Sequence, residues 1–458
     1  MIVSVPAIDK YIGLLCYATS TEGIQGTIRK VPADFIVREV LVDGSVAQID
    51  NPIAAPILGA SDTKQAYLLC VLVKRNWDTL IAIKKIAKQL GIDPGRIDIA
   101  GIKDAKAKTA QHITIEDGSM EDVSRVNIKD VDLRPVGYLR DKMSSYYLLG
   151  NHFNITICAL SKEKQVLEQQ ISETAKQLST LEGIPNFFGH QRFGTSRSIT
   201  HLVGRALVKG RFDEAAMLFL AKHSQDEHPE SMKARMDLES TQDFKKALNG
   251  FPKQLRFERL MLVHLSEDPT DFIGSFRRLP VKLRTLFVQA YQSYLFNHFL
   301  SQRLLNGFPL NAAIPGDYVV NVERSGLPMV QTGKVVNSEE LPRINELIHA
   351  GKMRVAIPLV GFKQKLSQGE MGKIENQALA AEETKTHDFA INGMPEISCL
   401  GGLRTVLSPV LEFKPGNVTT DSDNKQKIEL EFELLKGSYA TMLLRELMKP
   451  KDPLVAGF

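Results

Sequence analysis

The spacing of hydrophobic and polar residues changes along this chain and predicts three parts. The first part alternates short apolar runs with helical periods. Its predicted strands are residues 26–40, which Pro32 breaks into two, and residues 66–73, 96–100, 112–115 and 147–160. Its predicted helices are residues 79–90, with Asn76 or Asp78 as the cap and Gly91 at the end, and residues 162–178. Alternation of this kind is typical of α/β proteins.

The middle of the chain has a different period. From residue 190 to about residue 401 the spacing predicts a largely helical region. Its strongest helical periods lie in residues 199–223 and 281–305. The charged residues 224–254 are expected at the surface.

Strand character returns near the end of the chain. In residues 427–435 apolar side chains alternate with glutamates, so one face of the strand should be buried and the other wet. A final helix over residues 439–449 is predicted to begin after Ser438 as its cap. This strand and helix are too few to form a core alone, which favours one α/β domain with a helical insertion over three domains in a row. The predicted parts are residues 1–189, 190–404 and 405–458.

Composition narrows the function only slightly. The 458 residues include 57 basic and 53 acidic side chains, and a net charge of +4 permits a nucleic-acid partner without requiring one. Four distant cysteines with no CxxC pair suggest neither a zinc site nor disulfides and fit a reducing compartment. No apolar run reaches the length of a membrane helix, so we expect a soluble, cytoplasmic protein with no membrane partner. The lack of a long coiled coil favours a monomer.

Several common catalytic signatures are missing. The chain has no GxSxG, P-loop or Rossmann fingerprint, which leaves serine hydrolases, NTPases and dinucleotide enzymes without their usual support. His112 and His190 lie at no metal-ligand spacing to another ligand, so no metal site is expected.

Residues 100–111 (AGIKDAKAKTAQ) form the segment with the densest candidate chemistry. Asp104 stands in a short loop among Lys103, Lys106 and Lys108. Nearby cations favour an ionised carboxylate, which can act as a nucleophile or a base, and the lysines could meet phosphates. From the spacing alone, a solvated loop with incidental charges is the commoner explanation.

Residues 183–194 (GIPNFFGHQRFG) form the second candidate segment. Its glycines indicate tight turns or a close backbone approach, and aromatic rings beside an arginine can stack on bases and hold phosphates. Phe187 and Phe188 are better explained as core residues. Gln191 and Arg192 are harder to explain by packing.

Read together, a series of segments spans nearly the whole chain in a fixed order. They are PADFIVREV (residues 32–40), AGIKDAKAKTAQ (100–111), GNHF (150–153), GIPNFFGHQRFG (183–194) and GSYATMLLREL (437–447), with QAYQSYLFN (289–297) as a looser sixth. In this combination the chain resembles the D-type (TruD) family of tRNA pseudouridine synthases. The AGxKDxxAxTxQ and PNxFGxQRFG patterns are each highly specific.

The resemblance implies a fold and an activity. The fold would be an α/β (α+β) pseudouridine synthase-type catalytic domain with a mixed antiparallel sheet, interrupted by a large, mainly helical TRUD domain. The substrate would be tRNA, commonly the uridine at position 13, and the reaction would need no cofactor, nucleotide or metal. The insertion is longer than in compact bacterial members and more similar to archaeal and eukaryotic ones.

The resemblance also implies site residues. The family's catalytic aspartate falls on Asp104, and its basic partner falls on Arg29, with a one-residue ambiguity with Lys30. The asparagine and phenylalanine of the uracil pocket fall on Asn151 and Phe153, which we expect to bond the uracil edge and to stack on the base.

Other polar residues are expected to bind RNA or to hold the fold. The candidate contacts to the RNA backbone are Lys103, Lys106, Arg192 and Arg197. The residues expected to be structural are Glu39, as an ion-pair partner, and Tyr439, Arg445 and Glu446, which would close the final helix on the sheet.

The reaction exchanges the C1′–N1 bond of a flipped uridine for a C1′–C5 bond. Attack of Asp104 at C1′, attack at C6 and proton abstraction at C2′ all fit one carboxylate. A tRNA-binding or folding factor without catalysis is the main alternative, although an acid facing phosphates does not help a pure binder. A metal-assisted nuclease is disfavoured because no acidic or histidine cluster has ligand spacing.

Overall fold

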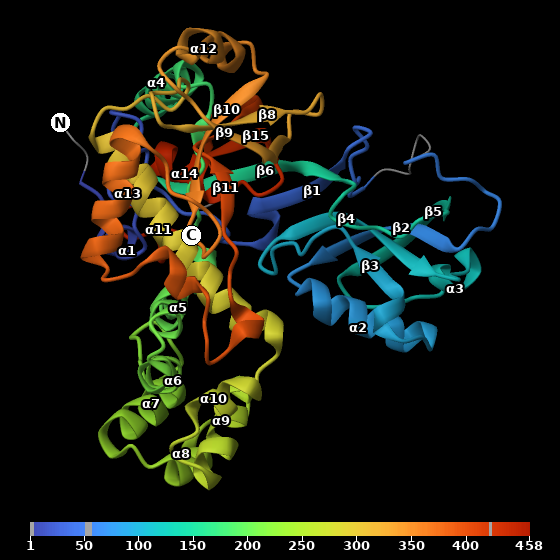
Figure 1. Cartoon of the computed structure of the whole chain (residues 1–458). Coiled ribbons are helices and arrows are strands. Elements are labelled where there is room, and N and C mark those ends of the chain that lie inside the picture. Colours follow the sequence, from blue (N-terminus) through green and yellow to red (C-terminus); the bar gives the residue numbers. More distant parts are fainter. Residues whose placement is uncertain (1–3, 51–56, 421–423) are drawn as a thin grey trace.

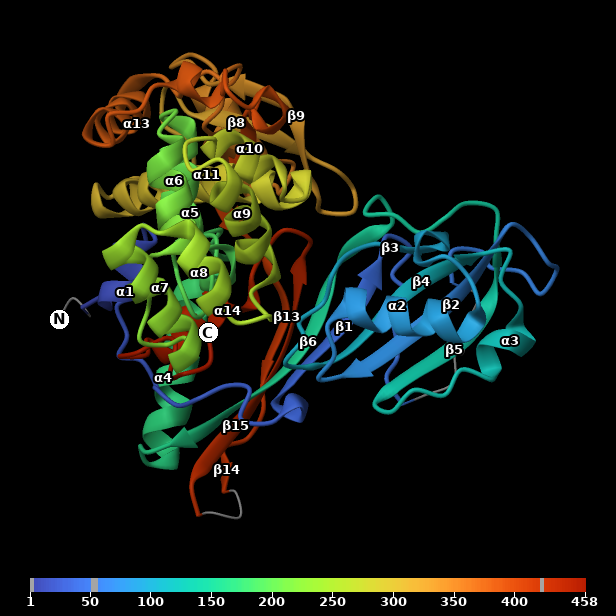
Figure 2. The same cartoon turned by 90° about the horizontal axis from the view of Figure 1, so that it is seen from below.

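A nine-stranded sheet runs through the molecule and joins both ends of the chain. The computed structural model describes residues 4–50, 57–420 and 424–458. The strand order is β13-β15-β6-β1-β4-β2-β5, with β14 paired to β15 and β3 to β4 (Figures 1 and 2). These strands are β1 (Phe35–Leu41), β2 (Tyr67–Arg75), β3 (Ile97–Ile99), β4 (Lys108–Glu116), β5 (Val131–Leu139), β6 (Leu148–Leu160), β13 (Val410–Pro415), β14 (Thr419–Thr420) and β15 (Gln426–Leu435).

Strand pairing explains how the C-terminal segment joins the N-terminal one. β1 runs antiparallel to β6 and parallel to β4, so the sheet is mixed, as predicted. β15 runs antiparallel to β6 and sets Phe432 opposite Phe153. The apolar face predicted for β15 is buried, and its residues join the core formed by β1 and β6. The last strand therefore completes the sheet that the first strands begin.

Two helices of the first part follow the predicted pattern closely. α2 (Thr79–Leu90) begins at Asp78, whose carboxylate accepts from the backbone N–H groups of Leu80 and Ile81, and ends at Gly91 in the left-handed conformation. α4 (Lys164–Thr180) lies two residues further along than predicted. Two short helices, α1 (Ala7–Tyr11) and α3 (Met120–Ser124), were not predicted.

Helices α5 to α11 form a region on one side of the large sheet (Figure 2). They are α5 (Thr200–Val208), α6 (Phe212–Leu220), α7 (Pro229–Thr241), α8 (Phe244–Gly250), α9 (Arg256–Glu267), α10 (Phe272–Arg277) and α11 (Val281–Leu305). α5 packs closely on α11 because Gly204 has no side chain; a Cβ atom there would lie 2.0 Å from the carbonyl oxygen of Phe287. The helical character predicted for this region is confirmed.

The expectation of a largely helical middle region is incomplete, because this region also contains a four-stranded sheet. Its order is β11-β10-β8-β9. Its strands are β8 (Tyr318–Val322), β9 (Pro328–Val335), β10 (Met353–Leu359) and β11 (Gly402–Thr405), and α12 (Leu341–His349) and α13 (Gly369–Ala381) accompany them. β9 has no buried residue and β11 has only four residues, so neither shows a clear alternation of apolar and polar residues.

Two local predictions are wrong. Residues 26–31 form no regular strand; Thr27 makes one bridge to Cys158, and Arg29 has a φ of 60° that interrupts an extended chain. Ser438 does not cap α14 (Ala440–Met448), because the N-cap is Tyr439 and the Ser438 hydroxyl bonds that of Ser408.

A buried charge cluster ties α14 to the N-terminal segment and to residues 183–194. The Asp9 carboxylate accepts from Arg445 Nε at 2.6 Å and bonds His190 Nε2 at 2.7 Å. Glu446 accepts from the backbone N–H and the hydroxyl of Thr19. Burial would raise the pKa of Asp9, but Arg445 and His190 hold it below its ordinary value. Arg445 and Glu446 are therefore structural, as predicted.

We expect Asp9→Asn to destabilise the protein by about 3–5 kcal/mol, because it leaves the buried Arg445 guanidinium without this carboxylate. Thermal unfolding at pH 7 measures the loss. Since the pKa of Asp9 is depressed in the folded state, its stabilising contribution exists above about pH 4 and disappears as the pH falls. The exposed Asp62→Asn is the control, and equal melting temperatures for both variants would contradict the role of Asp9.

Candidate active site

Asp104 lies in the loop between β3 and β4, and the buried Lys74 holds the backbone of this loop. Lys74 Nζ donates to the carbonyl oxygens of Asp104 and Trp77, each at 2.8 Å, and lies 3.4 Å from that of Lys103. Burial lowers the pKa of Lys74 to about 8, although Asp104 and Asp78 act in the opposite direction. A lysine with no exposed surface thus fixes the main chain at the candidate catalytic residue.

Two further polar side chains support the same loop. The backbone N–H of Lys103 donates to Thr79 Oγ1 at 3.1 Å, at the start of α2. Gln111 Nε2, on β4, donates to the carbonyl oxygen of Gly101 at 3.1 Å. Thr79 and Gln111 are fully buried, so the loop is supported by buried polar side chains whose hydrogen bonds are satisfied.

One carboxylate oxygen of Asp104 is the meeting point of two donors. Arg29 Nη2 and Gln191 Nε2 each lie 3.1 Å from Asp104 Oδ1. The Asp104 side chain is 28% exposed, whereas that of Arg29 is 9% exposed. In the part of the chain that the structure describes, Oδ2 accepts no hydrogen bond. The carboxylate is therefore held on one oxygen and left free on the other.

Arg29 is fixed on three sides. Its Nη1 donates to the carbonyl oxygen of Gly457 at 2.7 Å, and its guanidinium lies over the Phe35 ring, 3.9 Å from the ring centroid. Burial lowers the pKa of Arg29, and the charge of Asp104 opposes this shift. Of the two candidates at this position, Arg29 and Lys30, the structure brings Arg29 to Asp104.

Lys103 belongs to a buried ion pair next to the loop. The prediction that Lys103 contacts RNA phosphates is therefore corrected. Its Nζ lies 2.8 Å from Glu39 Oε1 and donates to Asn151 Oδ1 at 2.6 Å. Burial would raise the pKa of Glu39, but Lys103 and His112 lower it. A 6% exposed lysine with these partners cannot reach a phosphate. Glu39 is the ion-pair partner that the sequence suggested.

Asn151 and Phe153 lie two residues apart on the same face of β6 but differ in exposure. Asn151 is half-buried, and its amide nitrogen has no partner among the described residues. Phe153 is 5% exposed, stacks on Phe432 at 5.2 Å and meets the edge of Phe35 at 6.4 Å. The structure thus places Asn151 at the site and Phe153 beneath it, packed in the core, where a base cannot stack on it in this conformation.

The remaining predicted RNA contacts fall in different surroundings. Lys106 is exposed two residues after Asp104. Arg192 is half-buried and bonds only neutral groups, Ser293 Oγ and Gln289 Oε1, each at 3.2 Å. Arg197 is the second correction: its guanidinium pairs with Glu258 and donates to backbone carbonyls within the helical region, so its charge is used internally.

Sequence reasoning missed Lys74 and gave Gln191 no specific role. The strand predicted over residues 66–73 ends one residue before Lys74, although the observed β2 includes it. A lysine at the end of an apolar run, four residues before the Asp78 cap, was the available signal. Phe187 and Phe188 are buried, as predicted.

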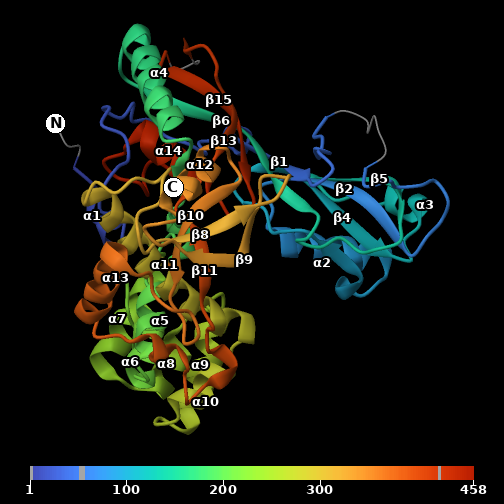
Figure 3. The same ribbon diagram turned by 45° about the horizontal axis from the view of Figure 1, so that its top comes forward.

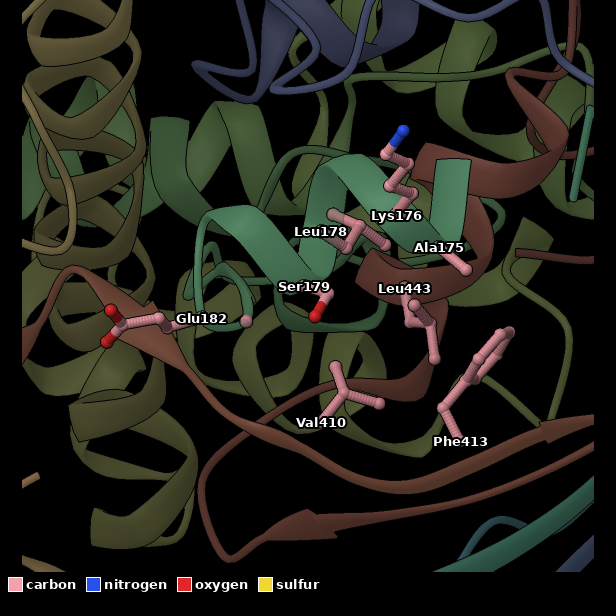
Figure 4. A pocket seen from close by; sticks show the side chains of 9 residues that line it. Ala175, Lys176, Leu178, Ser179, Glu182, Val410, Phe413 and Leu443 are labelled. Carbon is pink, nitrogen blue, oxygen red and sulfur yellow. The ribbon is translucent and has the colours of Figure 1, made fainter. Parts of the chain in front are cut away.

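A separate cavity of about 490 Å³ lies between α4, β13 and α14 (Figure 4). Leu178, Val410, Phe413 and Leu443 converge on it, while the charged ends of Lys176 and Glu182 point away. None of the residues that contact Asp104 lines this cavity. It lacks the convergent polar groups of a catalytic site.

The described residues contain neither a metal-binding cluster nor a membrane-spanning helix. No group of three or more histidine, cysteine, aspartate or glutamate side chains is placed to hold a metal ion. None of the helices there is both long and apolar enough to span a membrane.

Comparison with known proteins gives one consistent answer. The family model described as tRNA pseudouridine synthase D (TruD) matches residues 11–447. Relatives named "Probable tRNA pseudouridine synthase D" include one from Methanosarcina acetivorans, 39% identical with 99% of each chain covered. Another, from Thermococcus sibiricus, is 37% identical and covers 94% of this chain and 97% of its own.

A solved structure agrees with these relatives. The crystal structure of a protein assigned as tRNA pseudouridine synthase D (TruD) from Methanosarcina mazei superposes with a TM-score of 0.83. It is 36% identical and covers 99% of this chain and 100% of its own. The family match spans the segments that supply Arg29, Asp104 and Gln191. The chain therefore belongs to the tRNA pseudouridine synthase D (TruD) family.

Proposed function

We propose that this protein converts a uridine of tRNA, commonly the one at position 13, to pseudouridine, with Asp104 as the catalytic carboxylate. The observation that carries the proposal is the geometry of Asp104, which is held by Arg29 and Gln191 on one oxygen and open on the other. Membership of the TruD family supports the reaction and the substrate class.

The reaction is an isomerisation, so its atoms balance without a co-reactant. The C1′–N1 bond breaks, the uracil turns, a C1′–C5 bond forms, C5 loses its proton and N1 gains one. The free Oδ2 of Asp104 attacks C1′ or C6, or removes the C2′ proton; all three routes start from an ionised carboxylate. Arg29 holds the Asp104 carboxylate by a charge-assisted hydrogen bond.

The uridine must leave its helix to reach Asp104, at a cost of a few kcal/mol. We propose that the amide of Asn151 bonds the uracil edge, because its nitrogen remains a free donor beside the Lys103 ammonium. Phe153 then supports the site from below together with Phe35 and Phe432, and stacking on uracil remains a prediction for the RNA-bound state. Lys106 and Arg192 are the retained candidates for backbone phosphates.

We also propose that residues 190–404 form the insertion and that residues 1–189 and 405–458 form the catalytic domain. The pairing of β15 with β6 supports this division. A cytoplasmic location and a monomeric state remain expectations, and four free thiols are compatible with the location.

A tRNA-binding factor without catalysis remains the second candidate. The extensive support beneath the Asp104 loop argues against it, because a carboxylate repels phosphates and would not help a pure binder. Product analysis decides between the two functions.

We expect Asp104→Asn to lower the rate of pseudouridine formation by about 10³-fold or more, because the amide is a poor base and nucleophile. Its Kd for tRNA should stay within about threefold, since the amide keeps the shape. Pseudouridine is counted by mass spectrometry after single turnover without added metal or nucleotide. Asp62→Asn is the control. Equal product from Asp104→Asn and wild type would remove the assigned role, and tight tRNA binding without product in either protein would favour the binding factor.

Substitutions of Arg29 should lower the rate of pseudouridine formation. We expect Arg29→Met to lower the single-turnover rate about 100-fold and Arg29→Lys about tenfold, because lysine restores the charge but cannot bond Asp104 and the Gly457 carbonyl at once. Full activity of Arg29→Met would show that Asp104 needs no cationic partner.

The contact between Lys74 and the Asp104 carbonyl predicts that Lys74 positions the catalytic loop. We expect Lys74→Met to slow the chemical step about 10- to 100-fold with little change in tRNA affinity, because the Asp104 carbonyl loses its donor and the loop shifts. Lys85→Met, on the neighbouring α2, is the matched control. A purely structural role would instead lower the melting temperature and leave the rate per folded molecule unchanged.

A further inference from the structure

A cavity of about 150 Å³ lies where the small sheet meets the end of the large sheet. Its walls come from β9, β10 and β11 on one side and from residues 407–409 and the end of β15 on the other. The small sheet that contains β9, β10 and β11 can be followed in Figures 1 and 3. Three of its lining residues are cations, Arg354, Arg404 and Lys436, and none is a carboxylate. The lining of the cavity is therefore positively charged, and no carboxylate in that lining balances the charge.

Arg354, on β10, is the unusual member of this set. It is half-buried, and its guanidinium makes no hydrogen bond or ion pair with any other described residue. Burial lowers the pKa of its guanidinium, with no neighbouring carboxylate to oppose the shift. By contrast, the buried Arg303 makes two bonds of 2.8 Å to Asp317. Because this guanidinium is only half-buried and bonds no described protein group, its donors remain available to a ligand that enters the cavity.

The other two cations, Arg404 and Lys436, bond only neutral groups among the described residues, so no carboxylate there balances their positive charge. Arg404 donates to the carbonyl and side-chain oxygens of Asn186, at 2.9 and 2.6 Å, and to the Gly437 carbonyl at 2.8 Å. Lys436 Nζ donates to the Ser145 carbonyl at 3.1 Å. These bonds fix both side chains without neutralising them.

Two segments of the chain contribute both to the wall of this cavity and to the candidate active site. Leu435, in its wall, directly follows Leu434, which pairs with Asn151 across β15 and β6. Asn186, also in its wall, lies five residues before Gln191, which bonds Asp104. The same two segments therefore supply wall residues to the cavity and contact residues to the candidate active site.

We propose that this cavity binds a phosphate group of the substrate RNA backbone next to the flipped uridine, with Arg354 as its principal donor. A guanidinium matches a phosphate by two parallel hydrogen bonds, and Arg404 and Lys436 add positive potential. The volume is below that of pockets that enclose whole small molecules, which suits a single charged group. The inference rests on the proposed function for the source of the phosphate.

The test compares wild type with Arg354→Met, Arg354→Lys and the control Arg343→Met, which removes an exposed charge from the nearby α12. We expect Arg354→Met to weaken tRNA binding about tenfold. The slope of log Kd against log salt concentration should fall by about one, because one phosphate contact is lost. Arg354→Lys should keep most of the slope, and Arg343→Met should match wild type. Melting temperatures confirm that each variant is folded.

A second arm uses inorganic phosphate without RNA. Weak stabilisation of wild type that Arg354→Met removes, together with the changed salt slope, supports a phosphate site used by RNA. Phosphate stabilisation with an unchanged tRNA slope would overturn the RNA assignment and leave a site for free phosphate. Unchanged behaviour in both arms, with wild type still forming pseudouridine, would refute this inference alone. If wild type formed no pseudouridine, the proposed function would fail, and the phosphate arm would still decide whether the cavity binds an anion.

Discussion

The ion pair between Arg29 and Asp104 is the interaction on which the arrangement of this protein depends. Arg29 comes from the N-terminal segment, Asp104 from the loop after β3, Gln191 from the segment before the helical region, and the Gly457 carbonyl from the C-terminus. Four distant segments thus meet at one carboxylate. The segment that follows α14 thus supplies the second acceptor of the Arg29 guanidinium.

Buried polar groups beneath the site hold the Asp104 loop in one conformation. Lys74 binds backbone carbonyls, and Glu39 pairs with Lys103 out of contact with water. Such groups add little net stability, because desolvation offsets much of their attraction. Breaking one partner is costly, however, so only one conformation satisfies them all. The same logic applies to Asp9 and Arg445, which hold α14 against the segment that carries Gln191.

Much of the fold could be predicted from apolar periodicity, which identified β2, β6, β15, α2 and α11. The small sheet could not, because β9 has no buried residue and β11 is too short to show an apolar alternation. At the candidate site, the family motifs pointed to Asp104 and, with an ambiguity of one residue, to Arg29. Burial decided the rest: Lys103 and Arg197 share the composition of RNA-binding residues, but each is paired inside the protein. Contacts between segments far apart in sequence are not encoded in local patterns, so Lys74 was missed.

The most direct test of this account is a structure of the Asp104→Asn variant bound to its tRNA substrate. The account predicts one uridine flipped out of the RNA, with C1′, C6 or the C2′ hydrogen-bearing carbon about 3–3.5 Å from the substituted side chain, on the side away from Arg29. Which of these atoms lies closest would also choose among the three chemical routes. A flipped uridine held elsewhere, or a tRNA bound with every base still stacked, would contradict the central role of the carboxylate.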